Sequence, residues 1–422
     1  MVTRRSWPTT SRATLIHSGG RVTSVAVIGA GPYGLSIAAY LHDYGVNTRV
    51  FGIPLDTWRS HMPAGMLLKS DGFASNVYDP KSAGTLAEYC RERGIPYHET
   101  DIPVPLDVFS DYATDFQRRF VPGLEEVLVT SLTRNGNGFL LKLTDGQEVL
   151  ADRVVCAVGI SHFAALPTEL AGLPPELASH AYDHHELTKF AGRHVTVIGA
   201  GASAVDTAVL LGDNGATVSL VARSNVVKFG GKPEPRGLWE KLRSPSSGVG
   251  PGLRNWLCEA TPSLFRFLPG NLRLRLIRSH LGPKSPWHMK ARFDAGVSTH
   301  LGREIVSARE VDGRVELNLG GETLTTDHVL AATGYYPDLA RLEFLSDDLR
   351  RSVRSHARMP LVSRSFESSV PGLYFVGPAA VNTFGPLMRF MVGAEYVAPR
   401  ISHHLAQGAP AIRSRRRRWL VR

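Results

Sequence analysis

The sequence contains few cysteines and no long hydrophobic run. Three cysteines, Cys90, Cys156 and Cys258, occur among 422 residues, and no two have the spacing of a metal site or a redox C-x-x-C pair. This excludes a flavin–dithiol mechanism, which needs two neighbouring thiols. The odd count, without a secretion signal, predicts a cytoplasmic protein. The longest uncharged apolar runs have about ten residues against roughly 20 for a bilayer span, so no integral membrane association is expected.

Acidic residues are also absent from both ends of the chain. The net charge is +10, from 48 basic and 38 acidic residues. Residues 1–22 and 411–422 together contain ten arginines and no acid, so the rest of the chain is balanced. We therefore interpret residues 1–21 and 411–422 as basic, disordered tails and expect no nucleic-acid partner.

Two stretches of the sequence repeat without a gap. Residues 25–34 and 195–204 align at an offset of 170, which maps Gly29 and Gly31 onto Gly199 and Gly201, and farther along Gly45 onto Gly215. Residues 146–159 and 321–334 form a second repeated pair, each with an Asp seven positions before its final Gly. Internal similarity of this kind predicts two copies of one fold.

Each repeat begins with an apolar strand, a Gly-rich turn and a helical stretch, residues 35–44 in the first copy and 205–214 in the second. This order is typical of a pyrophosphate site, where the glycines allow close backbone approach and the helix N-terminus donates hydrogen bonds. Two dinucleotide sites are therefore predicted. The first comprises Gly29, Gly31, Pro32, Tyr33 and Gly34, and the second Gly199, Gly201, Ser203 and Ala204.

The acid that usually binds the ribose hydroxyls is missing after the second strand of both copies. Gly52 stands there in the first copy, and Ala222 followed by Arg223 in the second. An arginine without a carboxylate beside it can pair with a 2′-phosphate, so we predict NADPH rather than NADH at the second site. Two tandem dinucleotide domains suit a flavin reduced by a nicotinamide, which predicts FAD at the first.

The predicted fold class is α/β, with two Rossmann-like domains and the NAD(P) domain inserted into a discontinuous FAD domain. We assign residues 22–160 and 330–410 to the FAD domain, with its last strand at 372–377 and last helix at 387–405. The NAD(P) domain is assigned to residues 161–329, with a lid-like insertion at 226–296. The insertion contains a basic amphipathic run, which we interpret as a solvated face, or alternatively as a surface that admits substrate or touches a membrane.

On these motifs the chain resembles the two-dinucleotide-domain flavoproteins, and within them the flavin-containing and N-hydroxylating monooxygenases. The resemblance is carried by the two Gly-rich turns, Ser203 and Asp206 in the second, and residues 332–335 and 372–377. Residues 58–76 and 383–389 look like a bacterial branch that includes urate hydroxylases and amino-acid N-oxygenases. The Baeyer–Villiger fingerprint is not matched, because seven residues rather than three separate Gly172 from His180.

The resemblance implies an NADPH-dependent oxidoreductase in which reduced FAD activates O₂ at its C4a atom and one oxygen passes to a small molecule. Two alternatives stay open: a flavin reductase or oxidase that passes electrons to a partner or to O₂, and a non-catalytic redox sensor.

Further candidate residues lie outside the glycine turns. Trp58 is expected beside the flavin, with a core position as the alternative. His61, Asp71 and Asn76 are candidates for orienting substrate or flavin, and each has a structural role as its alternative. Gly377 is expected to contact the ribityl chain of the flavin. The segment after it is expected to open the last helix toward the flavin, through Phe384 and Gly385, with Arg389 one turn in.

Overall fold

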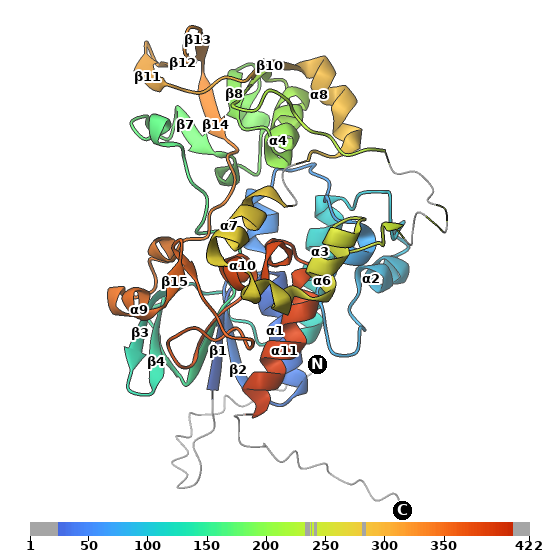
Figure 1. Ribbon diagram of the computed structural model, residues 1–422, viewed down its shortest axis with the longest axis vertical. Helices are drawn as coiled ribbons and strands as arrows, with labels where there is room; N and C mark the ends of the chain where they lie inside the picture. Colours follow the sequence, from blue (N-terminus) through green and yellow to red (C-terminus); the bar gives the residue numbers. More distant parts are fainter. Residues whose placement is uncertain (1–23, 233–236, 238, 240–242, 281–283, 408–422) are drawn as a thin grey trace, which may run out of the picture.

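The computed structural model describes residues 24–232, 237, 239, 243–280 and 284–407. It has two α/β units, one built on the N-terminal strands and one on the middle of the chain (Figure 1). The predicted basic tails, 1–21 and 411–422, and short parts of the predicted insertion lie outside the described residues.

The first sheet joins the two ends of the described chain. Its strands are β1 (Ser24–Ile28), β2 (Asn47–Phe51), β6 (Arg153–Cys156) and β17 (Leu373–Phe375), in the order β17-β6-β1-β2. All neighbouring strands are parallel. Because β17 comes from the C-terminal part of the chain, this unit is discontinuous, as the sequence predicted.

The second sheet is formed entirely by the middle of the chain. Its strands are β7 (Ala178–His180), β8 (His194–Ile198), β9 (Thr217–Ala222), β10 (Val297–Leu301) and β14 (His328–Ala331), in the order β10-β9-β8-β14-β7. These pairs are also parallel. The predicted fold class, two Rossmann-like α/β domains with one inserted into the other, is confirmed.

The repeat in sequence is a repeat in structure. Helix α1 (Pro32–Asp43) follows β1, and α4 (Ala202–Asp213) follows β8 at the same offset. Both helices begin about three residues before the predicted stretches. In α1, Pro32 at the first helical position favours this early start. Each unit also carries an antiparallel three-stranded sheet. The first consists of β3 (Val129–Asn135), β4 (Gly138–Leu143) and β5 (Glu148–Ala151), and the second of β11 (Ser307–Val311), β12 (Arg314–Asn318) and β13 (Thr323–Thr326).

The final helix is shorter at its start than predicted. In place of one helix over 387–405, a 3₁₀ turn covers Pro386–Arg389 and α11 covers Gly393–Gln407. The interruption lies at Phe390, whose backbone is extended (φ −113°, ψ 149°), and Gly385 with φ +80° separately ends the short helix α10 (Val381–Phe384). Phe384 and Gly385 therefore do not open the last helix, and Arg389 ends the 3₁₀ turn rather than lying one turn inside α11.

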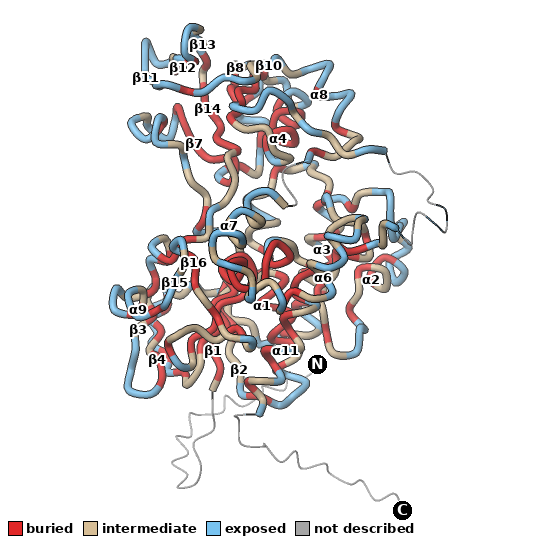
Figure 2. The backbone as a smooth tube through the Cα atoms, viewed as in Figure 1, coloured by how far each residue is buried: buried red, intermediate tan, exposed pale blue. Residues whose placement is uncertain are grey.

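Burial follows the two sheets and the helices on them (Figure 2). In the first unit α11 packs along α1, and its small residues Ala394 and Ala398 are fully buried there. The remaining helices are α2 (Leu86–Arg93), α3 (Leu106–Phe120), α6 (Leu253–Ala260), α7 (Gly270–Ser279), α8 (Lys290–Gly296) and α9 (Asp347–Ser352). Short two-residue strands β15 (Ser355–His356) and β16 (Met359–Pro360) pair with each other.

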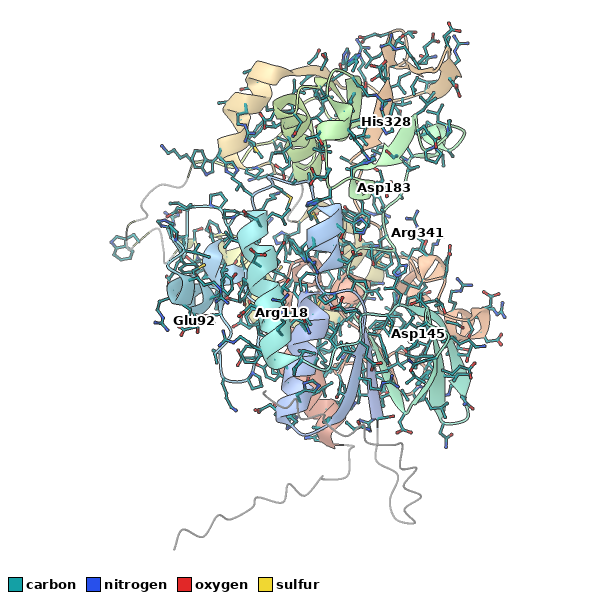
Figure 3. The ribbon with its side chains drawn as sticks, turned by 180° about the vertical axis from the view of Figure 1, so that it is seen from behind. Glu92, Arg118, Asp145, Asp183, His328 and Arg341 are labelled. Carbon is teal, nitrogen blue, oxygen red and sulfur yellow. The ribbon has the colours of Figure 1, made fainter. Side chains whose placement is uncertain are left out.

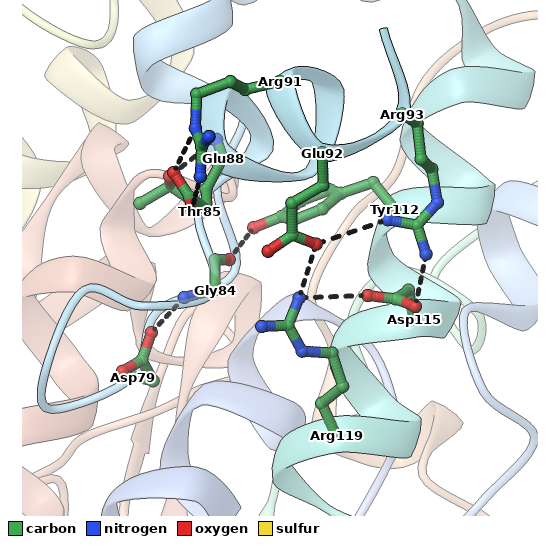
Figure 4. Close-up of polar contacts among 10 residues, drawn as sticks. All are labelled: Asp79, Gly84, Thr85, Glu88, Arg91, Glu92, Arg93, Tyr112, Asp115 and Arg119. Atoms are coloured by element: carbon green, nitrogen blue, oxygen red, sulfur yellow. Dashed lines mark hydrogen bonds and ion pairs between the residues drawn. The ribbon is translucent and has the colours of Figure 1, made fainter. Parts of the chain in front are cut away.

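Helices α2 and α3 are joined by charged side chains (Figure 4). Arg93 donates to Asp115 at 2.8 Å, and Arg119 reaches Glu92 at 3.3 Å and Asp115 at 3.4 Å. Beneath them, the Tyr112 hydroxyl donates to the carbonyl of Gly84 at 2.7 Å. These contacts fix the loop before α2 against the outer side of the first unit.

Candidate functional site

The first Gly-rich turn is tightly packed on one side and open on the other. A Cβ on Gly29, where φ is +112°, would lie 2.4 Å from the carbonyl oxygen of Ala157. One on Gly34 would lie 1.9 Å from the Gly29 oxygen, so helix α1 can approach β1 only because no side chain is present. A Cβ on Gly31 would meet nothing within 4 Å. The turn therefore presents bare backbone to the space beyond Gly31.

The second turn repeats this arrangement with one difference. Gly199 has φ +139°, and its Cβ would lie 2.5 Å from the carbonyl oxygen of Ala332. The third position is Ala204, which the structure accommodates although Gly34 in the first copy has no room for a methyl group. Helix α4 is thus held slightly less closely to its strand than α1 is.

Both helices begin at a glycine without a side-chain cap. Gly31 precedes α1 and Gly201 precedes α4, and neither helix has an acidic residue in its first turn. The first backbone N–H groups of each helix, with the positive end of its dipole, are therefore available to an anion. This is the donor set that a dinucleotide pyrophosphate requires.

A cavity of about 1900 Å³ lies between the two units and reaches both turns. Its walls include Gly29–Tyr33 from the first turn and Ala202, Ser203 and Asp206 from the second. Apolar side chains from the loop after β2, among them Trp58, Met62 and Met66, form much of the remaining wall. The insertion closes another side with residues 243–251 and 284–288. One space thus connects the two predicted nucleotide sites.

The residues present fit two dinucleotides. An FAD would be held by the backbone of Gly29–Tyr33 and the N-terminus of α1, and an NADPH by Ala202, Ser203 and the N-terminus of α4. The fit rests on the bare glycine backbone, the uncapped helix ends and the shared cavity.

Three further predicted residues line the same cavity. The ring of Trp58 packs on Phe109 at 4.8 Å between centroids, so this residue is both a core contact and a cavity wall. Asp71 accepts from the backbone N–H of Asp101 at 3.3 Å. Arg389 donates to the carbonyl of His280 at 2.8 Å, and burial lowers its pKa. A part in binding stays a prediction for each of them.

His61 and Asn76 are not among the residues that line the cavity. His61 stacks on Tyr182 at 4.0 Å, with its ring nitrogens 2.9 Å from the Tyr182 carbonyl and 3.2 Å from Asp56. The Asn76 amide donates to the Phe73 carbonyl and accepts from the Leu86 N–H, each at 2.8 Å. These contacts fit the structural alternative for both residues.

The C-terminal segment supports the first turn from behind. Tyr33 donates to the carbonyl of Phe390 at 2.8 Å, and a Cβ on Gly377 would lie 3.4 Å from its ring. Phe384 is buried against Phe366 with ring centroids 4.3 Å apart. Gly377, Phe384 and Gly385 do not line the cavity, although Pro378 does. Direct flavin contacts for these three residues stay predictions.

Arg223 follows β9, as expected, and its side chain is 80% exposed. Its guanidinium lies 4.0 Å from the Glu304 carboxylate, an acid from the loop after β10 that the local sequence did not indicate. Arg223 lies outside the cavity walls. Arg223 is therefore accessible to a 2′-phosphate, and the Glu304 carboxylate would compete for its guanidinium.

No binding role was predicted for Asp206, a buried acid that lines the cavity together with Lys69. Asp206, on α4, is 4% exposed, and its Oδ1 has no hydrogen-bond partner among the described residues. Burial raises its pKa to about 7, and the charge of Lys69 opposes that shift. Lys69 donates to the carbonyl of Lys284, and burial lowers its pKa. The sequence signal that could have indicated this residue is that Asp206 is the one acid within the apolar stretch 204–211.

Other reactive groups lie away from the cavity or are shielded. Cys90 and Cys156 are buried, Cys258 is half-buried, and none is in a disulfide. Burial raises the pKa of all three thiols. Within the described ranges no group of three His, Cys, Asp or Glu side chains is arranged to hold a metal. None of the described helices has the length and apolarity needed to cross a membrane.

Asp183 and Arg341 lie near backbone connections between the two units (Figure 3). Arg341 donates to the carbonyl of Ala164 at 2.6 Å, and Asp183 accepts from the His180 N–H at 2.9 Å. The pairing of Ala164 with Tyr335 joins the outgoing and returning connections. These contacts define the crossing point of the chain beside the cavity.

The fold and the paired glycine turns define a two-domain FAD- and NAD(P)-binding oxidoreductase. Residues 23–236 match the family described as pyridine nucleotide-disulphide oxidoreductase, and the chain belongs to this family.

Several of the proteins similar to this chain are oxygenases, and a ferredoxin–NADP reductase of Ignicoccus hospitalis is 28% identical over 47% of this chain and 55% of its own. A probable indole-3-pyruvate monooxygenase of Arabidopsis thaliana is 27% identical over 74% of this chain and 75% of its own. A senecionine N-oxygenase of Tyria jacobaeae is 28% identical over 50% of this chain and 49% of its own. Among solved structures, ornithine hydroxylase from Pseudomonas aeruginosa has a TM-score of 0.68 at 16% identity, covering 92% of this chain and 99% of that one.

Proposed function

We propose that the protein is an FAD- and NADPH-dependent monooxygenase of a small molecule. The observation that carries the proposal is the single cavity of about 1900 Å³ that connects both Gly-rich turns. A nicotinamide and a flavin must meet for hydride transfer, and separate pockets would prevent this. When bound, FAD would take hydride from NADPH and activate O₂ for transfer of one oxygen to substrate.

The chain's own residues would bind and orient the two cofactors and would exclude water from the reacting centre. The backbone of Gly29–Tyr33 and the α1 N-terminus would hold the FAD pyrophosphate, and Ser203 with the α4 N-terminus would hold that of NADPH. Trp58, Met62 and Phe390 line the cavity and would keep bulk water from the reacting centre.

The absence of paired thiols favours oxygenation over dithiol chemistry within this family. Disulfide reduction through the protein needs two thiols that can exchange with each other. Cys90 and Cys156 are buried in the first unit and Cys258 lies on α6, and no disulfide joins any of them. We propose a substrate that is oxidised directly at the flavin.

Several finer assignments belong to the same proposal. We propose domain limits of 22–160 with 330–410, and 161–329; the last boundary divides β14 (His328–Ala331), which pairs with β8 in the second sheet. Arg223 would favour NADPH over NADH, and Glu304 would be displaced when the phosphate binds. We also propose that the protein works in the cytoplasm, on the cysteine usage of its sequence.

Rapid mixing tests the oxygenase directly. The flavin-loaded protein is reduced anaerobically with NADPH and then mixed with O₂ while the flavin spectrum is recorded. We expect a transient spectrum that is neither reduced nor oxidised flavin. In steady state, indole-3-pyruvate or a tertiary amine is added as a trial substrate, with ¹⁸O₂ to trace the oxygen.

Incorporation of one ¹⁸O atom into product supports the proposal. Reduction by NADPH followed by direct return to oxidised flavin, with fast reduction of an artificial electron acceptor and no labelled product, would replace it with the reductase. Failure of both nicotinamides to reduce the flavin would leave the redox sensor.

A further inference from the structure

The helical part of the insertion exposes an unusual number of large apolar side chains. Six of them are exposed within the twenty residues that span α6, the following 3₁₀ turn and the start of α7. We call this surface the α6–α7 face, and it consists of Leu253, Trp256, Leu257, Leu264, Phe267 and Leu272. Neither α6 nor α7 has a single buried residue.

The opposite side of the same segment is fixed to the protein body. Leu274 and Ile277 pack on the core of the first unit, and Arg273 donates to the carbonyl of Asn382 at 3.0 Å. The 3₁₀ turn packs against α10, where Phe265 lies over Gly385. Figure 1 shows α6 and α7 on the near side of the first unit, with α7 next to α10. The segment is therefore held to the first unit on one side, and its exposed apolar side chains point toward solvent on the other.

The charge around the face has one sign. Arg254, Arg275 and Arg278 are exposed, and residues 253–279 contain no acid apart from Glu259. That carboxylate is engaged, because it accepts from the backbone N–H of Gly248 at 2.8 Å. A surface that combines exposed Trp, Phe and Leu with arginines is complementary to an apolar phase with an anionic boundary.

A small hollow on α7 adds a site for a phosphate group. It has a volume of about 420 Å³ and is lined by Asn271, Leu274, Arg275, Arg278 and Ser279. Two guanidinium groups with an amide and a hydroxyl suit the phosphate of a phospholipid headgroup. Ser279 also lines the large cavity, so this hollow lies next to it.

We propose that the α6–α7 face docks the protein on the surface of an anionic phospholipid bilayer. The apolar side chains would enter the interface while the arginines contact headgroup phosphates. A second copy of the chain fits less well, because a two-fold contact would bring arginines together without acids on the face to pair with them. The proposal does not depend on the reaction that the flavin performs.

Vesicle co-sedimentation of the full-length, flavin-loaded protein tests this docking. Vesicles of phosphatidylglycerol and phosphatidylcholine in equal parts are compared with phosphatidylcholine alone. The test variant is Leu253→Ser/Trp256→Ser/Phe267→Ser. Its matched control is Leu150→Ser/Val306→Ser, which also removes exposed apolar side chains but lies outside the face. Flavin content and melting temperature confirm that each variant is folded.

We expect wild type and control to bind the anionic vesicles equally, and the triple variant to bind at least about tenfold more weakly. Arg275→Gln/Arg278→Gln should weaken binding to anionic vesicles and reduce its salt dependence. The proposal is overturned if wild type does not bind. It is also overturned if the triple variant binds as well as wild type, because the unchanged Arg-rich tails would then be responsible. Wild-type dimers that the triple variant abolishes, without vesicle binding, would assign the face to a second copy.

Discussion

The glycine at the start of α1 offers a substitution that separates cofactor binding from folding. Gly31 has φ −86°, an ordinary value for any residue, and a Cβ there meets nothing within 4 Å. An Asp at this N-cap position can accept from the first helical N–H groups, so the protein without flavin should keep its stability in Gly31→Asp. The new carboxylate would face the space assigned to the FAD pyrophosphate.

The loss of flavin affinity can be worked out from charge alone. Two like charges about 4 Å apart repel by about 4 kcal/mol at an effective dielectric constant of about 20. That energy corresponds to about a thousandfold weaker binding, before any steric conflict is added. We therefore expect Gly31→Asp to purify colourless, with an unfolding transition close to that of flavin-free wild type.

Gly34→Ala is the contrasting variant. Its methyl group would lie 1.9 Å from the Gly29 oxygen, so α1 and β1 would have to separate by more than 1 Å. Overpacking of this kind costs about 1–3 kcal/mol or more, and both stability and flavin should be lost. Absorbance of bound flavin and thermal unfolding measure the two effects. A folded Gly31→Asp protein that stays yellow would refute the assignment of the first site.

Further substitutions test separate parts of the structure. Arg223→Ala should raise the KM for NADPH at least about tenfold and leave the KM for NADH unchanged, whereas the control Glu304→Gln should raise neither KM. Equal effects of Arg223→Ala on the two KM values would rule out binding of the 2′-phosphate by Arg223. Asp206 has a folded-state pKa of about 7, above its unfolded value, so its contribution to stability is lost as pH rises from about 4 to 7. In denaturant titrations the free energy of unfolding of Asp206→Asn, relative to that of wild type, should therefore increase across that pH range by up to about 4 kcal/mol. A difference that does not change with pH would contradict the raised pKa. Tyr33→Phe removes one of two donors to the Phe390 carbonyl, which still accepts from the Gly393 N–H, and should lower the free energy of unfolding by about 0.5–1.5 kcal/mol; an unchanged melting curve would refute this.

The parts of the fold that could be predicted from sequence are those with a local signal. The offset between the two Gly-rich turns gave the positions of β1 and α1 and of β8 and α4, because strand, turn and helix are encoded within about 20 neighbouring residues. Glycine-containing two-residue turns of a kind that local sequence favours also join β3 to β4, at Gly136-Asn137, and β11 to β12, at Asp312-Gly313.

The parts that were missed depend on residues distant in sequence. The effect of the Lys69 charge on Asp206, and the ion pair of Arg223 with Glu304, arise only when segments distant in the chain meet in space. The break before α11 lies at Phe390, whose backbone is extended and whose carbonyl accepts from the distant Tyr33 hydroxyl. No local pattern in residues 384–389 distinguishes this turn from the first turn of a helix.

The position of β17 has a consequence for how the protein is made. Strand β6 ends at Cys156, and its neighbour β17 begins at Leu373, about 200 residues later. At about 5–20 residues per second, a ribosome needs about 10–40 s to supply the missing strand. During that interval the second unit can fold, while β6 presents an unpaired apolar edge open to wrong pairing. Slowed translation of the last fifth of the chain should therefore lower the yield of native protein, because the open edge of β6 in the first unit has more time to pair wrongly.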